Sequence, residues 1–170
     1  MHSIWLMPDE AMQTRLSTIN RGFADKWGGP VFEPHITLLG DLDCNFTQIS
    51  NLCTGLFSKT SRQSAQVQSA DGTDCFFTSL FLDIDLPGNF KTKRSECAEA
   101  LGVQPASYRP HVSLAYGPIQ TTEKSYEIGR LVKEIGGLEF DVTSIALVES
   151  SNSIPVEHWK IIWRREFLTS

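Results

Sequence analysis

The chain lacks the long apolar runs and the basic surplus that mark membrane proteins and proteins of long nucleic acids. No apolar stretch approaches the ~20 residues that a membrane-spanning helix needs. The formal net charge is -5, whereas binding along a polynucleotide favours a basic face. Residues 1–7 carry no basic segment and run directly into Pro8-Asp9-Glu10, unlike a signal peptide. We therefore expect a protein of the cytoplasm or nucleus that binds neither a membrane nor a long nucleic acid.

Cysteine is scarce and shows no pairing pattern. Four cysteines are spread along the chain without a C-x-x-C pair or a histidine at zinc-finger spacing: Cys44, Cys53, Cys75 and Cys97. Structural zinc sites depend on such closely spaced ligands. The pattern therefore predicts free buried thiols and no structural metal site.

Apolar periodicity indicates the elements that are present. Apolar residues recur at helical spacing from Asp9 to Trp27, and Gly28-Gly29 ends the pattern. Asn45 is a candidate cap for the second helix, Thr121 or Thr122 for the fourth, and Asp71-Gly72 is typical of a turn. The predicted order is strand 3–7, helix 9–27, strand 32–39, helix 46–57, strands 65–69 and 75–83, helix 90–101, strand 110–116, helix 121–135, and strands 138–149 and 157–167.

This order repeats. Residues 9–83 and 88–167 each read helix, strand, helix, strand, strand, which is the pattern of an internal duplication. No flexible linker separates the two halves. We expect an α+β fold in which residues 1–170 form one bilobal domain, with two mainly antiparallel sheets facing a central cleft and helices outside.

The central strand of each half holds the same short motif, Pro34-His35-Ile36-Thr37-Leu38 in the first and Pro110-His111-Val112-Ser113-Leu114 in the second. Residues i and i+2 of a strand share a face, so each half presents an imidazole beside a hydroxyl while the apolar neighbours enter the core. A single histidine of this kind is usually structural. Two copies at the same place in a duplication favour a shared site.

Two histidines and two hydroxyls suit phosphoester chemistry. A neutral imidazole can activate water while a protonated one donates to a leaving alkoxide. The hydroxyls of Thr37 and Ser113 can donate to phosphoryl oxygens. The predicted catalytic residues are His35 and His111, with no cofactor and no metal. A metal hydrolase is a minor alternative, because the motifs contain no carboxylate ligand.

The paired His-x-Thr/Ser-x motifs resemble those of the two-histidine (2H) phosphoesterase superfamily, and the chain is most similar to its plant and yeast-type cyclic phosphodiesterases. Residues 3–10 resemble the opening of that family and residues 110–116 its second motif. The resemblance implies hydrolysis of ADP-ribose 1'',2''-cyclic phosphate to the 1''-phosphate and of nucleoside 2',3'-cyclic phosphates to 2'-phosphates. It also implies a place in the metabolism of tRNA-splicing by-products.

A substrate base or ribose needs an apolar wall, for which Trp5, Phe77 and Tyr116 are the candidates. Tyr116 lies an odd number of positions after His111, so on a regular strand its side chain would point to the opposite face. It reaches the cleft only if Gly117-Pro118 turns the chain. Arg109 is a weaker candidate for the border of the phosphate.

We expect a monomer acting on a small cyclic phosphate. Two alternatives stay open, namely a relative that processes RNA ends or 2',5' linkages and a nucleotide-binding module without turnover. The near symmetry of the motifs leaves open which histidine is the base.

Overall fold

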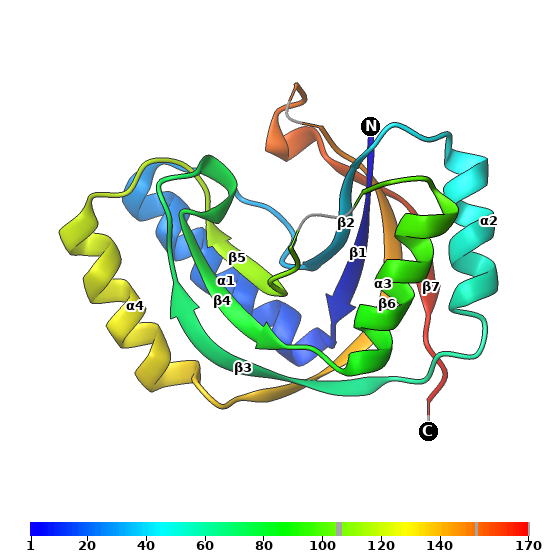
Figure 1. The fold of residues 1–170 in the computed structure, drawn as a ribbon. Helices are drawn as coiled ribbons and strands as arrows, with labels where there is room; N and C mark the ends of the chain where they lie inside the picture. The colour runs from blue at the N-terminus through cyan, green and yellow to red at the C-terminus, as the bar shows by residue number, and fades with distance from the viewer. Residues whose placement is uncertain (105–106, 152, 170) are drawn as a thin grey trace.

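The protein is an α+β fold, seen in a computed structural model that describes residues 1–104, 107–151 and 153–169. Within these ranges the elements are β1 (His2–Pro8), α1 (Glu10–Trp27), β2 (Ile36–Leu42), α2 (Phe46–Leu56), β3 (Gln63–Asp71), η1 (Phe76–Thr78), β4 (Leu80–Asp85), α3 (Gly88–Ala100), β5 (His111–Ala115), α4 (Thr121–Ile135), β6 (Glu139–Glu149), η2 (Val156–His158) and β7 (Lys160–Glu166). Helices α2 and α3 lie side by side on one flank of the molecule, and α4 lies on the opposite flank (Figure 1).

The strands form one sheet, which corrects the expectation of two. The order is β1-β2-β5-β4-β3-β6-β7, every pairing is antiparallel, and an additional β1–β6 pairing closes six strands into a barrel. The cause is the length of β6, which pairs with β3 through residues 139–142 and with β1 through residues 142–149. A single strand thus joins both halves in one sheet.

The two motif strands meet in the barrel and face their apolar side chains into the core. Ile36 of β2 pairs with Val112 of β5, and this is the register pair that joins the two strands. Ile36, Val112 and Leu114 are 0% exposed and Leu38 is 1% exposed. The predicted alternation of these strands is therefore confirmed, and the histidines and hydroxyls are left on the other face.

Several element boundaries differ from the prediction for local reasons. Strand β2 begins at Ile36 rather than residue 32, because the Phe32 amide donates to the Asn20 side chain (3.1 Å) and Pro34 has no amide proton. Gln120 precedes α4 without a side-chain cap, so neither candidate threonine caps that helix. Asn45 does cap α2, accepting from the Gln48 amide (2.8 Å).

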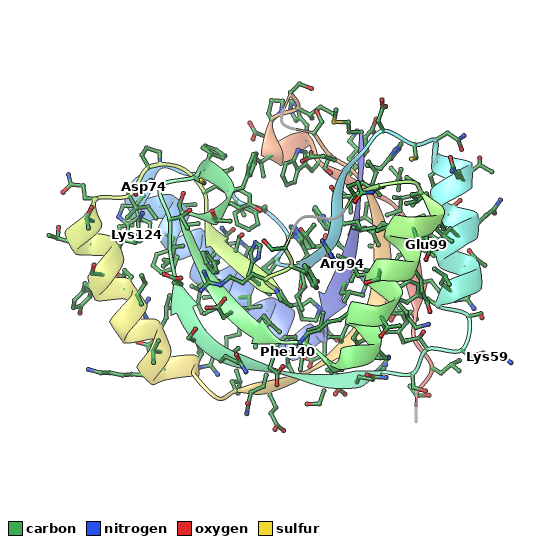
Figure 2. All side chains as sticks on the ribbon, in the orientation of Figure 1. Lys59, Asp74, Arg94, Glu99, Lys124 and Phe140 are labelled. Carbon is green, nitrogen blue, oxygen red and sulfur yellow. The ribbon has the colours of Figure 1, made fainter. Side chains whose placement is uncertain are left out.

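The expected tight turn at Asp71-Gly72 is instead a longer connection. Strand β3 runs to Asp71, and the chain reaches β4 only after η1. A Cβ at Gly72 would overlap the Ser79 carbonyl oxygen, so this close crossing requires glycine. Lys124 of α4 donates to the Thr73 carbonyl (2.5 Å) and contacts Asp74 (3.2 Å; Figure 2), which ties the connection to α4.

The cysteines are free, as expected, but they differ in exposure. Cys53 and Cys97 are buried, Cys44 is intermediate and Cys75 is exposed. The Cys53 and Cys97 thiols share a hydrogen bond, which together with burial raises the pKa of Cys53. In the part of the chain that the structure describes, no helix combines the length and apolarity needed to cross a membrane.

Candidate active site

Both histidine motifs open into one pocket, with a volume of about 240 Å³. Its lining includes the seven residues that the sequence singled out for catalysis or substrate contact: Trp5, His35, Thr37, Phe77, His111, Ser113 and Tyr116. The other two histidines, His2 and His158, do not line it. The closed barrel therefore brings together residues that are far apart in the chain.

Each motif histidine is oriented by a carbonyl two residues earlier. The His35 Nδ1 lies 2.7 Å from the Glu33 carbonyl oxygen, and the His111 Nδ1 lies 2.8 Å from that of Arg109. A carbonyl only accepts hydrogen bonds, so each Nδ1 carries the proton and each neutral ring keeps Nε2 as an acceptor. The two half-sites thus share one tautomer and one geometry.

The proline in each motif accounts for this geometry. Pro34 stands between Glu33 and His35, and Pro110 stands between Arg109 and His111. A proline holds its own φ near -65° and pushes the preceding residue to an extended conformation. It therefore restricts the direction of the carbonyl that receives the imidazole proton. The prolines that the motifs have in common are an orienting device.

The environments of the two imidazoles differ. His35 is 6% exposed and lies parallel to the Trp5 indole, with ring centroids 3.4 Å apart and 6° between the planes. Burial lowers the pKa of His35 to about 3; the hydrogen bond to Glu33 opposes this and the nearby His111 adds to it. His111 is partly exposed and tilted against Phe81, with centroids 5.2 Å apart. At neutral pH His35 is therefore an uncharged acceptor.

The two hydroxyls also differ. Among the described residues the Thr37 hydroxyl has no hydrogen-bond partner, while its carbonyl accepts from the Tyr108 hydroxyl (3.1 Å). The Ser113 hydroxyl already donates to the Phe77 carbonyl (2.9 Å). Burial raises the pKa of Tyr116, and a hydrogen bond with Ser113 opposes that rise. The Thr37 hydroxyl is thus available to donate to a ligand, whereas the Ser113 hydroxyl must first break its hydrogen bond to the Phe77 carbonyl.

An aromatic cluster closes one end of the pocket. Strand β5 ends at Ala115, and Gly117 has a φ of 98°, which turns Tyr116 into the lining. Its ring stacks on Phe32 with centroids 4.0 Å apart. Phe77 and Trp159 pack against the same cluster. This turn is the one that the strand parity of Tyr116 required.

Arg109 is held in place by two aspartates and contacts His111 through its backbone carbonyl, a role that the sequence did not predict. Its guanidinium lies 2.6 Å from Asp83 on β4 and 2.6 Å from Asp71 on β3. The charge is therefore neutralised by two carboxylates rather than directed at a phosphate. The same residue provides the carbonyl that holds His111. No local signal reveals this arrangement, because the two aspartates are distant in the chain.

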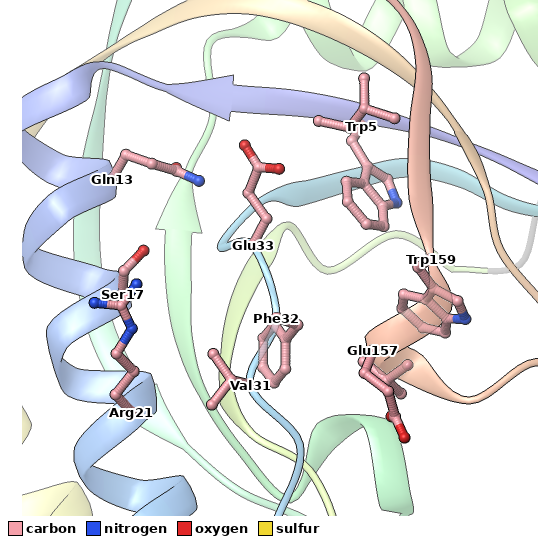
Figure 3. A pocket seen from close by; sticks show the side chains of 11 residues that line it. Trp5, Gln13, Ser17, Arg21, Val31, Phe32, Glu33, Glu157 and Trp159 are labelled. Carbon is pink, nitrogen blue, oxygen red and sulfur yellow. The ribbon is translucent and has the colours of Figure 1, made fainter.

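A second pocket, of about 480 Å³, lies beside Trp5 between α1 and β7 (Figure 3). Figure 3 shows Gln13 pointing from α1 toward Glu33, with Trp5 and Trp159 on the other side. Both polar side-chain atoms of Gln13 are buried without a partner in the described chain. Burial raises the pKa of Glu33, and Arg164 partly offsets this. Neither motif histidine lines this pocket.

No three histidine, cysteine, aspartate or glutamate side chains of the described residues gather as a metal site. The site consists of two oriented imidazoles, two hydroxyls and an aromatic wall. These groups can exchange protons with a ligand and donate hydrogen bonds to anionic oxygens.

Comparisons with known proteins show which proteins the whole chain is similar to. A cyclic phosphodiesterase of Arabidopsis thaliana is 23% identical over 171 residues, covering 95% of this chain and 92% of that protein. The crystal structure of TT0787 from Thermus thermophilus superposes with a TM-score of 0.65 at 17% identity, covering 98% of this chain and 97% of that one. Escherichia coli LigT complexed with 3'-AMP superposes with a TM-score of 0.62 at 12% identity, covering 98% and 97%.

The model of the 2'-5' RNA ligase superfamily matches residues 7–153, a span that contains both histidine motifs. The resemblance seen in the sequence is thereby confirmed. The chain belongs to the 2'-5' RNA ligase superfamily, the superfamily of two-histidine phosphoesterases.

Proposed function

We propose that this protein is a metal-independent cyclic phosphodiesterase. Its substrates would be nucleoside 2',3'-cyclic phosphates, opened to 2'-phosphates, and ADP-ribose 1'',2''-cyclic phosphate, opened to the 1''-phosphate. The observation that carries the proposal is the pair of imidazoles in one pocket, each with its Nδ1 proton committed to a carbonyl. The match to the Arabidopsis thaliana cyclic phosphodiesterase supports a cyclic phosphodiester as the bond that is cleaved.

The unequal burial of the two imidazoles assigns their roles in this proposal. Neutral His35 accepts a proton from water through Nε2 as the water oxygen attacks phosphorus. His111, which is partly exposed, gives a proton to the leaving 3'-oxygen as the P–O3' bond breaks. An anionic phosphate beside His35 raises the pKa of that imidazole from its ligand-free value and makes it a better base.

The remaining residues hold the phosphate and the ribose. The hydroxyls of Thr37 and Ser113 donate to the phosphoryl oxygens, where negative charge increases in the transition state. Trp5, Phe77 and Tyr116 form an apolar wall around the ribose. Each of these residues lines the same pocket as the histidines.

The proposal is tested by assaying hydrolysis of adenosine 2',3'-cyclic phosphate with and without EDTA. We expect equal rates in the two buffers and a bell-shaped pH profile. His35→Gln and His111→Gln should each lower kcat by about 10²–10⁴-fold, the usual contribution of a positioned acid or base. His158→Gln, outside the pocket, is the matched control. Near wild-type rates in both site variants, or loss of activity in EDTA, would contradict the proposal.

The family model favours one further candidate, processing of RNA ends or 2',5' linkages. The net charge of -5 weighs against a long polynucleotide substrate. An oligonucleotide ending in a 2',3'-cyclic phosphate, compared with the mononucleotide at two salt concentrations, separates the two. A strong preference for the oligomer with steep salt dependence would favour RNA processing.

A further inference from the structure

The pocket that holds both histidines is too small for a whole nucleotide. Its volume of about 240 Å³ falls below the ~300–1,000 Å³ of ordinary ligand sites. One end is closed by the aromatic cluster of Phe32, Tyr116, Val156, Phe77 and Trp159. The part of a substrate that lies beyond the ribose needs space in another direction.

That space lies on the His111 side. A pocket of about 510 Å³ adjoins the two-histidine pocket and has five lining residues in common with it: Thr37, Gly40, Asp41, Thr78 and His111. Its other walls include the apolar side chains of Leu39, Phe81, Val103 and the ring of Tyr108. His35 does not line it. The two pockets therefore form one asymmetric cavity that widens away from His35.

A planar platform is built into this adjoining pocket. The Arg94 guanidinium lies over the Tyr108 ring, 4.2 Å from the ring centroid. Arg94 projects from α3 toward the strands (Figure 2), where its Nε donates to the Leu38 carbonyl (3.0 Å). The Tyr108 hydroxyl donates to the Thr37 carbonyl (3.1 Å). The platform is thus tied to the strand that carries the Thr37 hydroxyl.

Asp41 stands at the boundary between the two pockets in a strained conformation. Its φ of 54° makes it the one non-glycine residue of the described chain with a positive φ. It lies at a register shift in β2, where Leu39 pairs with Ile4 and Leu42 with His2. Strain of this kind persists where surrounding structure enforces it and is concentrated at functional sites. A carboxylate here accepts from N–H or O–H groups and repels a second phosphate.

We propose that the adjoining pocket is the subsite for the nucleobase, a proposal that rests on the proposed function. The base stacks on the Tyr108–Arg94 platform near Phe81, and Asp41 accepts a hydrogen bond from the nucleoside. The substrate class is therefore a cyclic phosphate that bears a base, and the base lies on the side of His111.

The kinetic test blocks the subsite without touching the two histidines or the two hydroxyls. Val103 is partly exposed in the pocket wall, and Val103→Trp fills the space. The wild type should cleave adenosine 2',3'-cyclic phosphate with a kcat/KM about 10-fold or more above that of base-free methyl riboside 2',3'-cyclic phosphate, the scale of one base-stacking contact. Val103→Trp should abolish that advantage and leave the base-free substrate unaffected. Val132→Trp, at an exposed position on α4, should leave both unaffected.

An equal loss of kcat/KM on both substrates in Val103→Trp, or a retained advantage for the base-bearing substrate, would overturn the subsite.

A binding measurement separates this proposal from the proposed function. By calorimetry, adenosine 2'-phosphate should bind the wild type at least about 10-fold more tightly than base-free methyl riboside 2'-phosphate, and Val103→Trp should remove that difference. This outcome would support the subsite even if neither cyclic phosphate were hydrolysed. Equal affinity of the wild type for the two ligands would refute it.

Asp41 is tested in the same binding assay. Asp41→Asn keeps the size of the side chain and removes its charge, so the affinity for adenosine 2'-phosphate should fall several-fold while that for inorganic phosphate does not fall. Asp43→Asn, two residues on and outside both pockets, is the matched control. Equal effects of the two variants would remove Asp41 from the subsite.

Discussion

The indole of Trp5 lies parallel to the imidazole of His35, with 3.4 Å between ring centroids and 6° between the planes. The indole is itself only 3% exposed, so it covers one face of the histidine against water. A charged imidazole loses its hydration under such a cover, which is why burial lowers the pKa of His35. Trp5 thereby acts on the proposed base directly.

Replacing Trp5 with leucine should raise the pKa of His35 from about 3 toward 6.5. Water then reaches the imidazole and the charged form becomes less costly. The acid limb of kcat/KM against pH should move to higher pH, and the His35 ring resonances in NMR should titrate at higher pH. Trp27→Leu, in α1 and outside the pocket, should shift neither. An unchanged His35 titration in Trp5→Leu would show that the stack does not set this pKa.

The two hydroxyls should contribute unequally. Thr37→Val removes a donor that has no partner among the described residues, and should cost about 10-fold or more in kcat/KM, as expected for a hydrogen bond to a charged group. Ser113→Ala should cost less activity, because the Ser113 hydroxyl must break its hydrogen bond to the Phe77 carbonyl before it can bind a phosphate. It should cost more stability in urea unfolding, since the partly buried Phe77 carbonyl loses its donor. The reverse order of activity losses would contradict these roles.

The motif prolines should affect rate more than binding. Pro34→Ala and Pro110→Ala free the carbonyls of Glu33 and Arg109 to vary in direction, so each imidazole is less well aimed. We expect kcat to fall by up to about 10²-fold, the cost of a small misplacement of a catalytic group. KM should change little. Pro87→Ala, before α3, is the control. Wild-type kcat in both variants would show that the carbonyls need no proline.

Burial of neutral His35 should weaken the fold in acid. Its folded pKa of about 3 lies below the ordinary 6.5, so between these values the unfolded state binds more protons and stability falls as pH falls. From pH 6.5 to pH 5 this one group should lower the free energy of unfolding by about 2 kcal/mol. Urea titrations at the two pH values measure this loss. His35→Gln should lack this contribution, so an identical pH dependence in the variant would contradict it.

Local patterns in the sequence predicted much of the fold. The apolar stripe of α1, the cap at Asn45 and the alternation of both motif strands were all readable, because helix and strand periodicity reflect which side chains face the core. The predicted element boundaries were wrong where a contact with a residue distant in the sequence replaces the local hydrogen-bonding pattern. Phe32 leaves the strand pattern for a bond to Asn20, and the chain crosses closely at Gly72. Periodicity carries no information about such partners.

The two half-sites and the prolines that orient their imidazoles can be picked out from the amino-acid order alone, because each motif is local and its second copy supports the first. The union of the two expected sheets into one barrel cannot, since it depends on β6 pairing with both β3 and β1. The difference between the histidines is likewise a property of the folded chain. It comes from what packs on each imidazole, Trp5 in one case and partial contact with water in the other, and packing partners are chosen by the fold as a whole.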